Sequence, residues 1–177
     1  MTDNNGHQFD RLPATAADRT VEGRTTRTAV LEWWAERYGV PASVFEPFTF
    51  WEKGAGKLWI LHGDTASPTR IEALGMRILH TRQEHWKPTT NAVQRFGEHA
   101  RRNVIELERS AAERFVAGED QAIDWNGDWG YLIVSTTVGG ASVPIGVGLY
   151  LHGELRSQIP KSRRREVDSS VGKGQSA

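Results

Sequence analysis

The stretch YLIVSTTVGGASVPIGVGLYL (residues 131–151) decides the fold, because it predicts two β-strands joined by a tight turn. The strands cover residues 131–138 and 143–151, and two adjacent glycines lie in the turn between them. In the second strand, the side chains that alternate onto one face are Val143, Ile145, Val147, Leu149 and Leu151. Gly146 and Gly148 lie on the opposite face and predict close approach of another backbone, as in a small closed or nearly closed barrel.

The rest of the chain predicts short helices and strands around this hairpin. An amphipathic helix is expected over residues 28–38, where apolar residues recur at helical spacing and Gly39 supplies a stop signal. Further helices are expected from Pro88 and from the capping-box pattern at Ser110, with a helical turn over residues 70–74. Further strands are expected over residues 48–51, 58–61, 76–80, 103–107 and 155–159. The predicted fold class is therefore α+β, with a β-barrel-like unit preceded by a helix and β-hairpin subdomain.

The organisation expected along the chain is one domain with a small subdomain and two tails. Residues 1–25 are polar without periodicity and predict a disordered tail. Residues 26–85 are expected to form the helix and hairpin subdomain, and residues 86–162 the main domain. Residues 163–177 predict a tail that is basic and then flexible.

Composition indicates a protein with a hydrophobic core and excludes several kinds of chemistry. Hydrophobic residues make up 38% of the 177 residues, and Trp 7 of them, which is enough to build a core. Because the chain contains no Cys, disulfides, thiolate metal sites and cysteine nucleophiles are excluded. No apolar run approaches the roughly 18 residues of a membrane helix, and the polar N-terminus is not a secretory signal. We therefore expect a soluble cytoplasmic protein without a membrane partner.

The net charge of zero hides a segregation of charge along the sequence. Residues 77–104 carry six basic residues against two acidic ones, and residues 154–166 carry five against two. Between them, residues 105–130 carry seven acidic residues against two basic ones. If the two basic stretches meet in space, they form a positive surface able to hold phosphates. If they do not meet, they are ordinary solvated faces.

No catalytic constellation is recognisable in the sequence, which has neither a Gly-x-Ser-x-Gly elbow nor a His-Glu-x-x-His motif. The Gly-x-Gly-Lys sequence at residues 54–57 lacks the spacer and the Ser or Thr of a phosphate loop, so it predicts a hairpin turn. His80 and His85 are the closest His pair, at a spacing that does not suit a helical metal site. We expect no cofactor, no metal and no enzymatic activity. The alternative of an unrecognised enzyme would need a Ser or Thr nucleophile beside a His.

Six segments of the chain carry a resemblance to a known family. They are KPTTNAVQRFG (87–97), ARRNVIEL (100–107), FVAGE (115–119), GYLIV (130–134), GVGLY (146–150) and LRSQIPK (155–161). In order and spacing they resemble the C-terminal PUA-like RNA-binding domain of RsmF-type (Fmu/NOP family) RNA cytosine-5 methyltransferases. Residues 33–59 are similar to the segment that precedes such a domain in archaeal relatives. The chain resembles most closely short stand-alone haloarchaeal proteins of unknown function.

The resemblance implies a PUA-like small β-barrel with flanking helices over residues 86–162, and a function in RNA binding. The methyltransferase domain and catalytic cysteines of that family are not found in this sequence. The implied partners are structured RNA, rRNA or tRNA, and a separately encoded RNA methyltransferase. The implied role is accessory to RNA modification or ribosome biogenesis. The alternative is a protein-interaction adaptor that keeps the PUA-like fold without RNA binding, motivated by the adjacent Trp33 and Trp34.

Basic and aromatic side chains in and around this domain are the candidate RNA contacts. Arg and Lys suit the phosphates of an A-form backbone, and the rings of Trp86 and Tyr150 can stack on an unpaired base. The residues predicted to bind RNA are Arg82, Trp86, Lys87, Thr89, Arg101, Arg102, Tyr150, Arg156, Lys161, Arg163 and Arg164.

Overall fold

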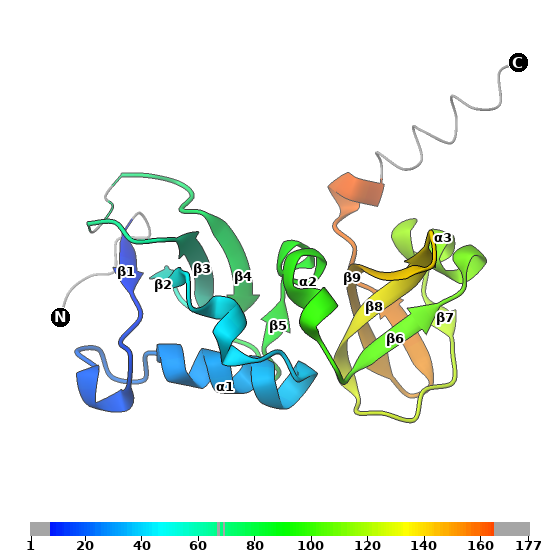
Figure 1. Cartoon of the computed structure of the whole chain (residues 1–177), viewed down its shortest axis with the longest axis horizontal. Helices are drawn as coiled ribbons and strands as arrows, with labels where there is room; N and C mark the ends of the chain where they lie inside the picture. The colour runs from blue at the N-terminus through cyan, green and yellow to red at the C-terminus, as the bar shows by residue number, and fades with distance from the viewer. Residues whose placement is uncertain (1–7, 67, 69, 165–177) are drawn as a thin grey trace, which may run out of the picture.

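The computed structural model of the chain describes residues 8–66, 68 and 70–164, which form two five-stranded sheets and three α-helices (Figure 1). The first sheet is antiparallel and has the order β1 (Phe9–Arg11), β2 (Phe48–Lys53), β3 (Lys57–His62), β4 (Met76–His80), β5 (Lys87–Pro88). The second has the order β6 (Val104–Leu107), β8 (Gly130–Val138), β9 (Ala141–Leu151), β10 (Glu154–Ser157), β7 (Gln121–Ala122), with β6 parallel to β8. The helices are α1 (Arg27–Tyr38), α2 (Thr90–Phe96) and α3 (Arg109–Val116), with 3-10 turns η1 (Ala16–Asp18), η2 (Ala42–Phe45) and η3 (Gly97–His99). None of the helices in these described ranges is long and apolar enough to cross a membrane.

A helix and a hairpin build the N-terminal half of the chain, as predicted. Helix α1 begins where the Thr26 hydroxyl accepts a hydrogen bond from the amide of Ala29. It ends at Gly39, whose left-handed backbone (φ 69°) closes the last turn. Strands β2 and β3 form a hairpin whose turn contains Gly54 and Gly56, both at positive φ. The predicted helix and the predicted hairpin turn are therefore confirmed.

The predicted hairpin of β8 and β9 is also confirmed, and it forms the centre of the second sheet. This sheet is curled like half a barrel, with β6 and β7 as its two edges (Figure 1). Strand β9 runs between two hydrophobic clusters, since Val147 belongs to the first cluster and Tyr150 to the second. The predicted α+β fold is confirmed in its coarse form, as a mixture of helices and sheets in which the second sheet is an open half-barrel.

The glycines of β9 make room for side chains, and the predicted close approach of another backbone is wrong. A Cβ at Gly146 would lie 2.6 Å from Cδ1 of Ile159. A Cβ at Gly148 would lie 2.5 Å from Cδ1 of Leu155. The curled sheet folds these apolar side chains over its own concave face, so they occupy the space that the glycines leave.

The two sheets share hydrophobic core across their junction. The first cluster contains Trp34 and Tyr38 from α1, and it also takes in Ile133 and Val147 from the second sheet. The second cluster lies within the curled sheet and beneath α3, where Phe115 is fully buried. Because the first cluster draws on both sheets, the two halves of the chain pack against each other as one body.

The junction between the sheets lies later in the chain than predicted. Strand β5 belongs to the first sheet, and Ala92, Val93 and Phe96 of α2 belong to the first core cluster. The second sheet begins with β6 at Val104. The predicted domain boundary at residue 86 therefore falls inside the first sheet, because β5 pairs with β4 from the preceding segment.

The predicted disordered tail is wrong for residues 8–25, because β1 pairs with β2 and buries Phe9 completely. The Phe9 ring packs edge-on against Trp59, with ring centroids 5.5 Å apart. A strand of three residues has no readable periodicity, and its order comes from a partner distant in sequence. Residues 1–7 and the predicted flexible tail over residues 165–177 lie outside the described residues.

Three predicted helix features differ from the structure. Residues 70–74 are not helical. Pro88 belongs to β5, because pairing with β4 keeps its backbone extended, and Thr89 is the N-cap of α2. Helix α3 begins at Arg109, so Ser110 lies inside its first turn and does not cap it.

Candidate nucleic-acid interface

Four side chains that can carry positive charge meet at the edge of the first sheet. His80 on β4 pairs across the sheet with Lys57 on β3 and with Lys87 on β5. Arg77 lies on the same strand as His80. Burial lowers the pKa of His80 below its ordinary value, and the charges of its three basic neighbours, first Arg77, lower it further. The four residues are called the β4 cluster below, and its three basic members form a local positive field that attracts anions.

Lys87 joins the β4 cluster to the C-terminal segment of the chain. Its ammonium donates a hydrogen bond of 2.8 Å to Oε1 of Gln158, which follows β10. The same ammonium lies 5.5 Å from the centre of the Tyr131 ring, in a cation–π contact. Partial burial in this position lowers the pKa of Lys87. The lysine therefore spans from the first sheet to the second.

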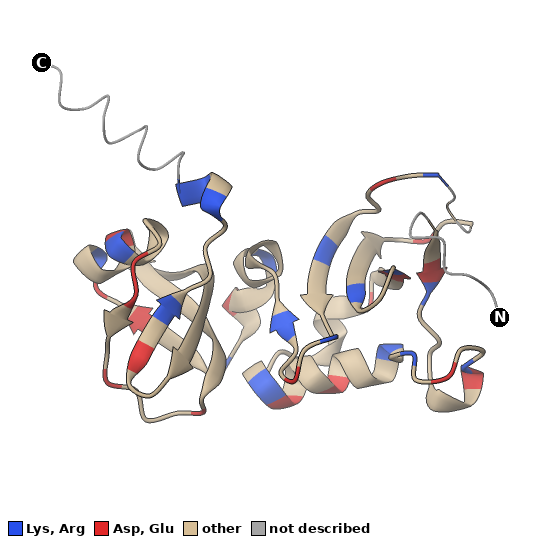
Figure 2. Cartoon of the chain, turned by 180° about the vertical axis from the view of Figure 1, so that it is seen from behind, with Lys and Arg blue, Asp and Glu red and all other residues tan. Residues whose placement is uncertain are grey.

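Arg163, in the helical turn over residues 161–164, makes a second bridge between the basic stretches. Its guanidinium donates to Oε1 of Gln94 at 3.2 Å and to Oδ1 of Asn91, and both acceptors lie on α2. The exposed ammonium of Lys161 has no hydrogen-bond or ion-pair partner among the described residues. Figure 2 shows Lys and Arg positions on β4, β5 and this terminal turn. The two basic stretches of the sequence therefore meet through α2 and β5.

Arg101 and Arg102 form a second cationic site at the C-terminal end of α1. Their backbone amides donate to the carbonyl of Tyr38 at 2.7 and 3.2 Å, which holds this linker against the helix end. Gly39 permits the approach, because a Cβ there would lie 3.2 Å from Cβ of Arg101. Both arginines are exposed, and neither guanidinium has a partner in the part of the chain that the structure describes. Both can therefore bind phosphate without breaking an internal contact.

Trp86 lines a pocket of about 270 Å³ close to these cations. The aromatic side chains around it, called the tryptophan pocket below, are Trp33, Trp86, Trp129 and Tyr131. Arg37, which lies near the end of α1, lines the same pocket. Trp86 is half-buried and also packs against the first core cluster. Part of its ring therefore packs on the core, and part lines the pocket.

Comparison with protein families assigns a domain to the second sheet. Residues 102–165 match the family described as the methyltransferase RsmF PUA domain. The chain carries a PUA-like domain. Residues 1–75 match a family of unknown function (DUF7122), and neither match is a methyltransferase catalytic domain. A search of curated proteins found no match to the chain.

Two residues of the PUA-like domain that were predicted to bind RNA have structural roles. Tyr150 is 3% exposed and its hydroxyl donates to the carbonyl of Ile123 at 2.8 Å, so the predicted stacking on a base is wrong. Arg164 donates to the carbonyl of Ser157 at 3.2 Å. Ahead of the domain, the Thr89 hydroxyl accepts a hydrogen bond from the first turn of α2 and donates to the carbonyl of Arg77. All three are held by internal contacts that the fold requires.

Two further predicted contacts do not join the cationic sites. Arg156 on β10 forms an ion pair with Glu154 at 2.8 Å, which offsets its charge. Arg82 lies in the loop after β4 and lines a different cavity, described next. Neither residue adds to the positive surplus of the β4 cluster.

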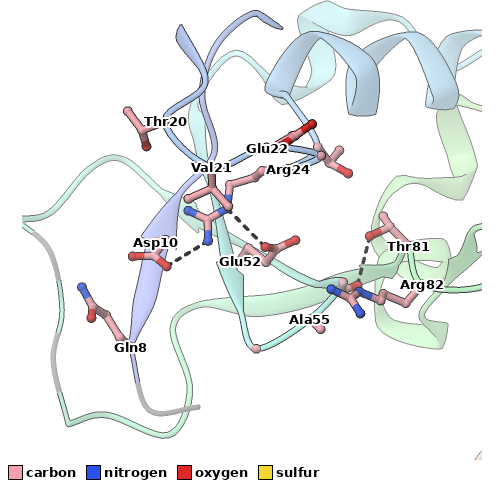
Figure 3. A pocket seen from close by; sticks show the side chains of 14 residues that line it. Gln8, Asp10, Thr20, Val21, Glu22, Arg24, Glu52, Ala55, Thr81 and Arg82 are labelled. Carbon is pink, nitrogen blue, oxygen red and sulfur yellow. Dashed lines mark hydrogen bonds and ion pairs between the residues drawn. The ribbon is translucent and has the colours of Figure 1, made fainter. Parts of the chain in front are cut away.

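The cavity beside Arg82 has a volume of about 660 Å³ and lies between β1 and the β2–β3 turn (Figure 3). Within it, Arg24 forms ion pairs with Asp10 at 3.1 Å and with Glu52 at 3.4 Å. Burial raises the pKa of Glu52, and the charge of Arg24 opposes that effect. Because acidic and basic groups are matched here, the cavity lacks the positive surplus of a phosphate site.

Residues that complete the two cationic sites and the tryptophan pocket were absent from the predicted contacts. They are Trp33, Arg37, Lys57, Arg77, His80, Trp129 and Tyr131. They come from α1, β3, β4, β8 and the position just before β8. No local pattern in the sequence therefore links them. The excess of basic residues over 77–104 was the one feature of the sequence that pointed to any of them, since it includes Arg77. No group of His, Asp or Glu side chains suited to hold a metal ion occurs among the described residues.

Proposed function

We propose that this chain binds structured RNA, rRNA or tRNA, through the β4 cluster, Arg101, Arg102, Lys161 and Arg163. The hydrogen bond from Lys87 to Gln158 carries the proposal, because it joins the two basic stretches of the sequence beside a PUA-like domain. A PUA domain from an RNA methyltransferase family supports RNA as the polyanion.

The chemistry of these side chains suits a phosphate backbone. Guanidinium groups without internal partners, as at Arg101 and Arg102, can each bind a phosphate through two parallel hydrogen bonds. The Lys ammonium groups act as point charges that tolerate small changes in backbone position. Such contacts recognise the shape and charge of an A-form helix without reading its sequence.

The role that follows is accessory to RNA modification or ribosome biogenesis in the cytoplasm. Because the chain has no Cys, it cannot itself carry out the cysteine-dependent methyl transfer of the family it resembles. A separately encoded RNA methyltransferase would supply that chemistry, with this chain holding the RNA. The proposed RNA-binding unit comprises the PUA-like domain together with β4, β5 and α2.

The alternative of a protein-interaction adaptor is less favoured, because only one of the two tryptophans that motivated it is accessible. Trp34 is fully buried, and Trp33 packs edge-on against it at 5.1 Å. Trp34 is therefore not available to a partner helix, whereas Trp33 is half-buried and lines the tryptophan pocket.

His80 provides a test of the proposed function, because RNA phosphate would reverse the charge that surrounds it. In the free protein its pKa is held below the ordinary value of 6.5, so His80 is neutral at pH 7.5 (about one unit above that value). Nearby phosphate favours the charged form and raises the pKa, so binding takes up a proton. Affinity for tRNA should therefore tighten as pH falls from about 7.5 to 5.5, by up to about tenfold per unit of pKa change.

The measurement is a filter-binding titration of the full chain and of His80→Gln with labelled tRNA at both pH values. The variant should bind with a weaker dependence on pH than the unsubstituted chain. Absence of tRNA and rRNA binding at both pH values would contradict the proposed function. An identical pH dependence in both proteins would mean that RNA does not bind at the β4 cluster.

A further inference from the structure

The tryptophan pocket has flat aromatic walls that come from three separate parts of the chain. The rings of Trp33 on α1 and Trp86 beside β5 lie 5.9 Å apart, inclined by 40°. Trp129, just before β8, lines the same pocket and is 55% exposed. Indoles offer a large flat surface on which planar rings can stack.

Hydrogen bonds hold the exposed wall of the pocket in place before any ligand binds. Nη2 of Arg37 donates to the carbonyls of Trp129 at 3.1 Å and Tyr131 at 2.8 Å. The Trp129 ring also packs edge-on against His152, with ring centroids 4.9 Å apart. On the other side, the amide of Asn103 donates to the carbonyl of Arg37 at 2.8 Å. A wall that is already ordered loses little conformational entropy when a ligand stacks on it.

The size and charge of the pocket narrow the class of ligand. Its volume of about 270 Å³ lies below the roughly 300–1,000 Å³ of pockets for drug-sized ligands, so one planar ring system fits and a base pair does not. Arg37 lines the pocket and is paired with Asp128 at 3.7 Å, and the Lys87 ammonium lies over Tyr131, so the charges around the pocket are mixed and suit an uncharged ring. Glu84, also in the lining, can accept a hydrogen bond from the amino group of a base.

We propose that the tryptophan pocket takes one unstacked nucleobase from RNA held by the neighbouring cations. This inference rests on the proposed RNA binding and adds a recognition element to it. Base stacking on Trp129 and Trp86 tolerates different bases, because every base has a π-face. The pocket would therefore select RNA with a bulged, looped or terminal nucleotide over fully paired RNA.

The test compares two RNA hairpins with the same stem, one fully paired and one with a single-nucleotide bulge. Binding of the full chain to each is measured by fluorescence anisotropy. We expect a preference of about tenfold for the bulged hairpin. Trp129→Ala should abolish this preference and keep the salt-dependent binding of the paired hairpin, and Trp129→Phe should retain most of the preference. Val138→Ala is the control, since Val138 is also exposed (61%) but does not line the pocket.

Each outcome separates this inference from the proposed function. Equal affinity of the full chain for both hairpins, or an unchanged preference in Trp129→Ala, overturns the base pocket and leaves RNA binding standing. Absence of binding to either hairpin overturns both. A trimethyl-lysine peptide that shifts the indole NMR signal of Trp129, where the bulged hairpin does not, would assign the pocket to a protein ligand and overturn the proposal.

Discussion

Replacing Arg101 and Arg102 together by Glu is expected to weaken binding of structured RNA at least about tenfold near physiological salt. Both guanidinium groups are exposed and have no partner among the described residues, so the substitution removes two phosphate contacts without breaking an internal one. It also places two negative charges beside Gly39, at the end of α1, within the proposed interface. Fluorescence anisotropy with labelled tRNA measures the loss.

The matched control is the pair Arg109→Glu and Arg114→Glu on α3. Arg109 is exposed as well, but it pairs with Glu113 at 3.2 Å and lies in the acidic stretch of the sequence. This variant has the same change in net charge, so it should bind RNA with nearly unchanged affinity if the interface is local. Equal losses in the two double variants would mean that net charge alone controls binding, contrary to the proposed interface.

Trp34→Ala is expected to cost about 3–5 kcal/mol of unfolding free energy, as for other fully buried large aromatics. Trp34 is 0% exposed, and its ring contacts Tyr38 and Phe45 at centroid distances of 5.5 and 5.7 Å. Because its core cluster includes Ile133 and Val147, the loss should lower the stability of both sheets in a single transition. Urea unfolding followed by circular dichroism and by tryptophan fluorescence measures it.

Trp129→Ala is the matched control, because the same substitution is made at an exposed position. Its cost should stay below about 1 kcal/mol, as is usual for surface substitutions. A comparable cost for both variants, or an unfolding of the second sheet that Trp34→Ala leaves unchanged, would contradict the shared core.

The elements with strong local signals were predictable from sequence, and those made by long-range pairing were not. Helix α1 and the hairpins β2–β3 and β8–β9 carry their own periodicity and turn glycines. Strands β1 and β5 have three and two residues, and they exist because β2 and β4 supply hydrogen-bond partners. Their absence from the prediction led to the wrong tail over residues 8–25 and to a domain boundary inside the first sheet.

The candidate site also has a part that the sequence predicted and a part that only the structure shows. Charge counting identified the two basic stretches, and the side-chain contacts of Lys87 and Arg163 bring them together. Alternation correctly placed Tyr150 on the face of β9 that carries Gly146 and Gly148, but it did not show that the second hydrophobic cluster buries this face. The tryptophan pocket joins Trp33, Trp86 and Trp129 from segments far apart in the chain, so no spacing rule could have assembled it.

The central claim, RNA binding by a compact set of cations, is tested most directly by the salt dependence of binding. The affinity of the full chain for tRNA and for rRNA fragments would be measured across a series of salt concentrations. If each of the seven permanently charged side chains of the proposed interface contacts a phosphate, the logarithm of the binding constant falls with the logarithm of salt at a slope of about −5 to −6. A slope near zero, or no binding at low salt, would contradict the account.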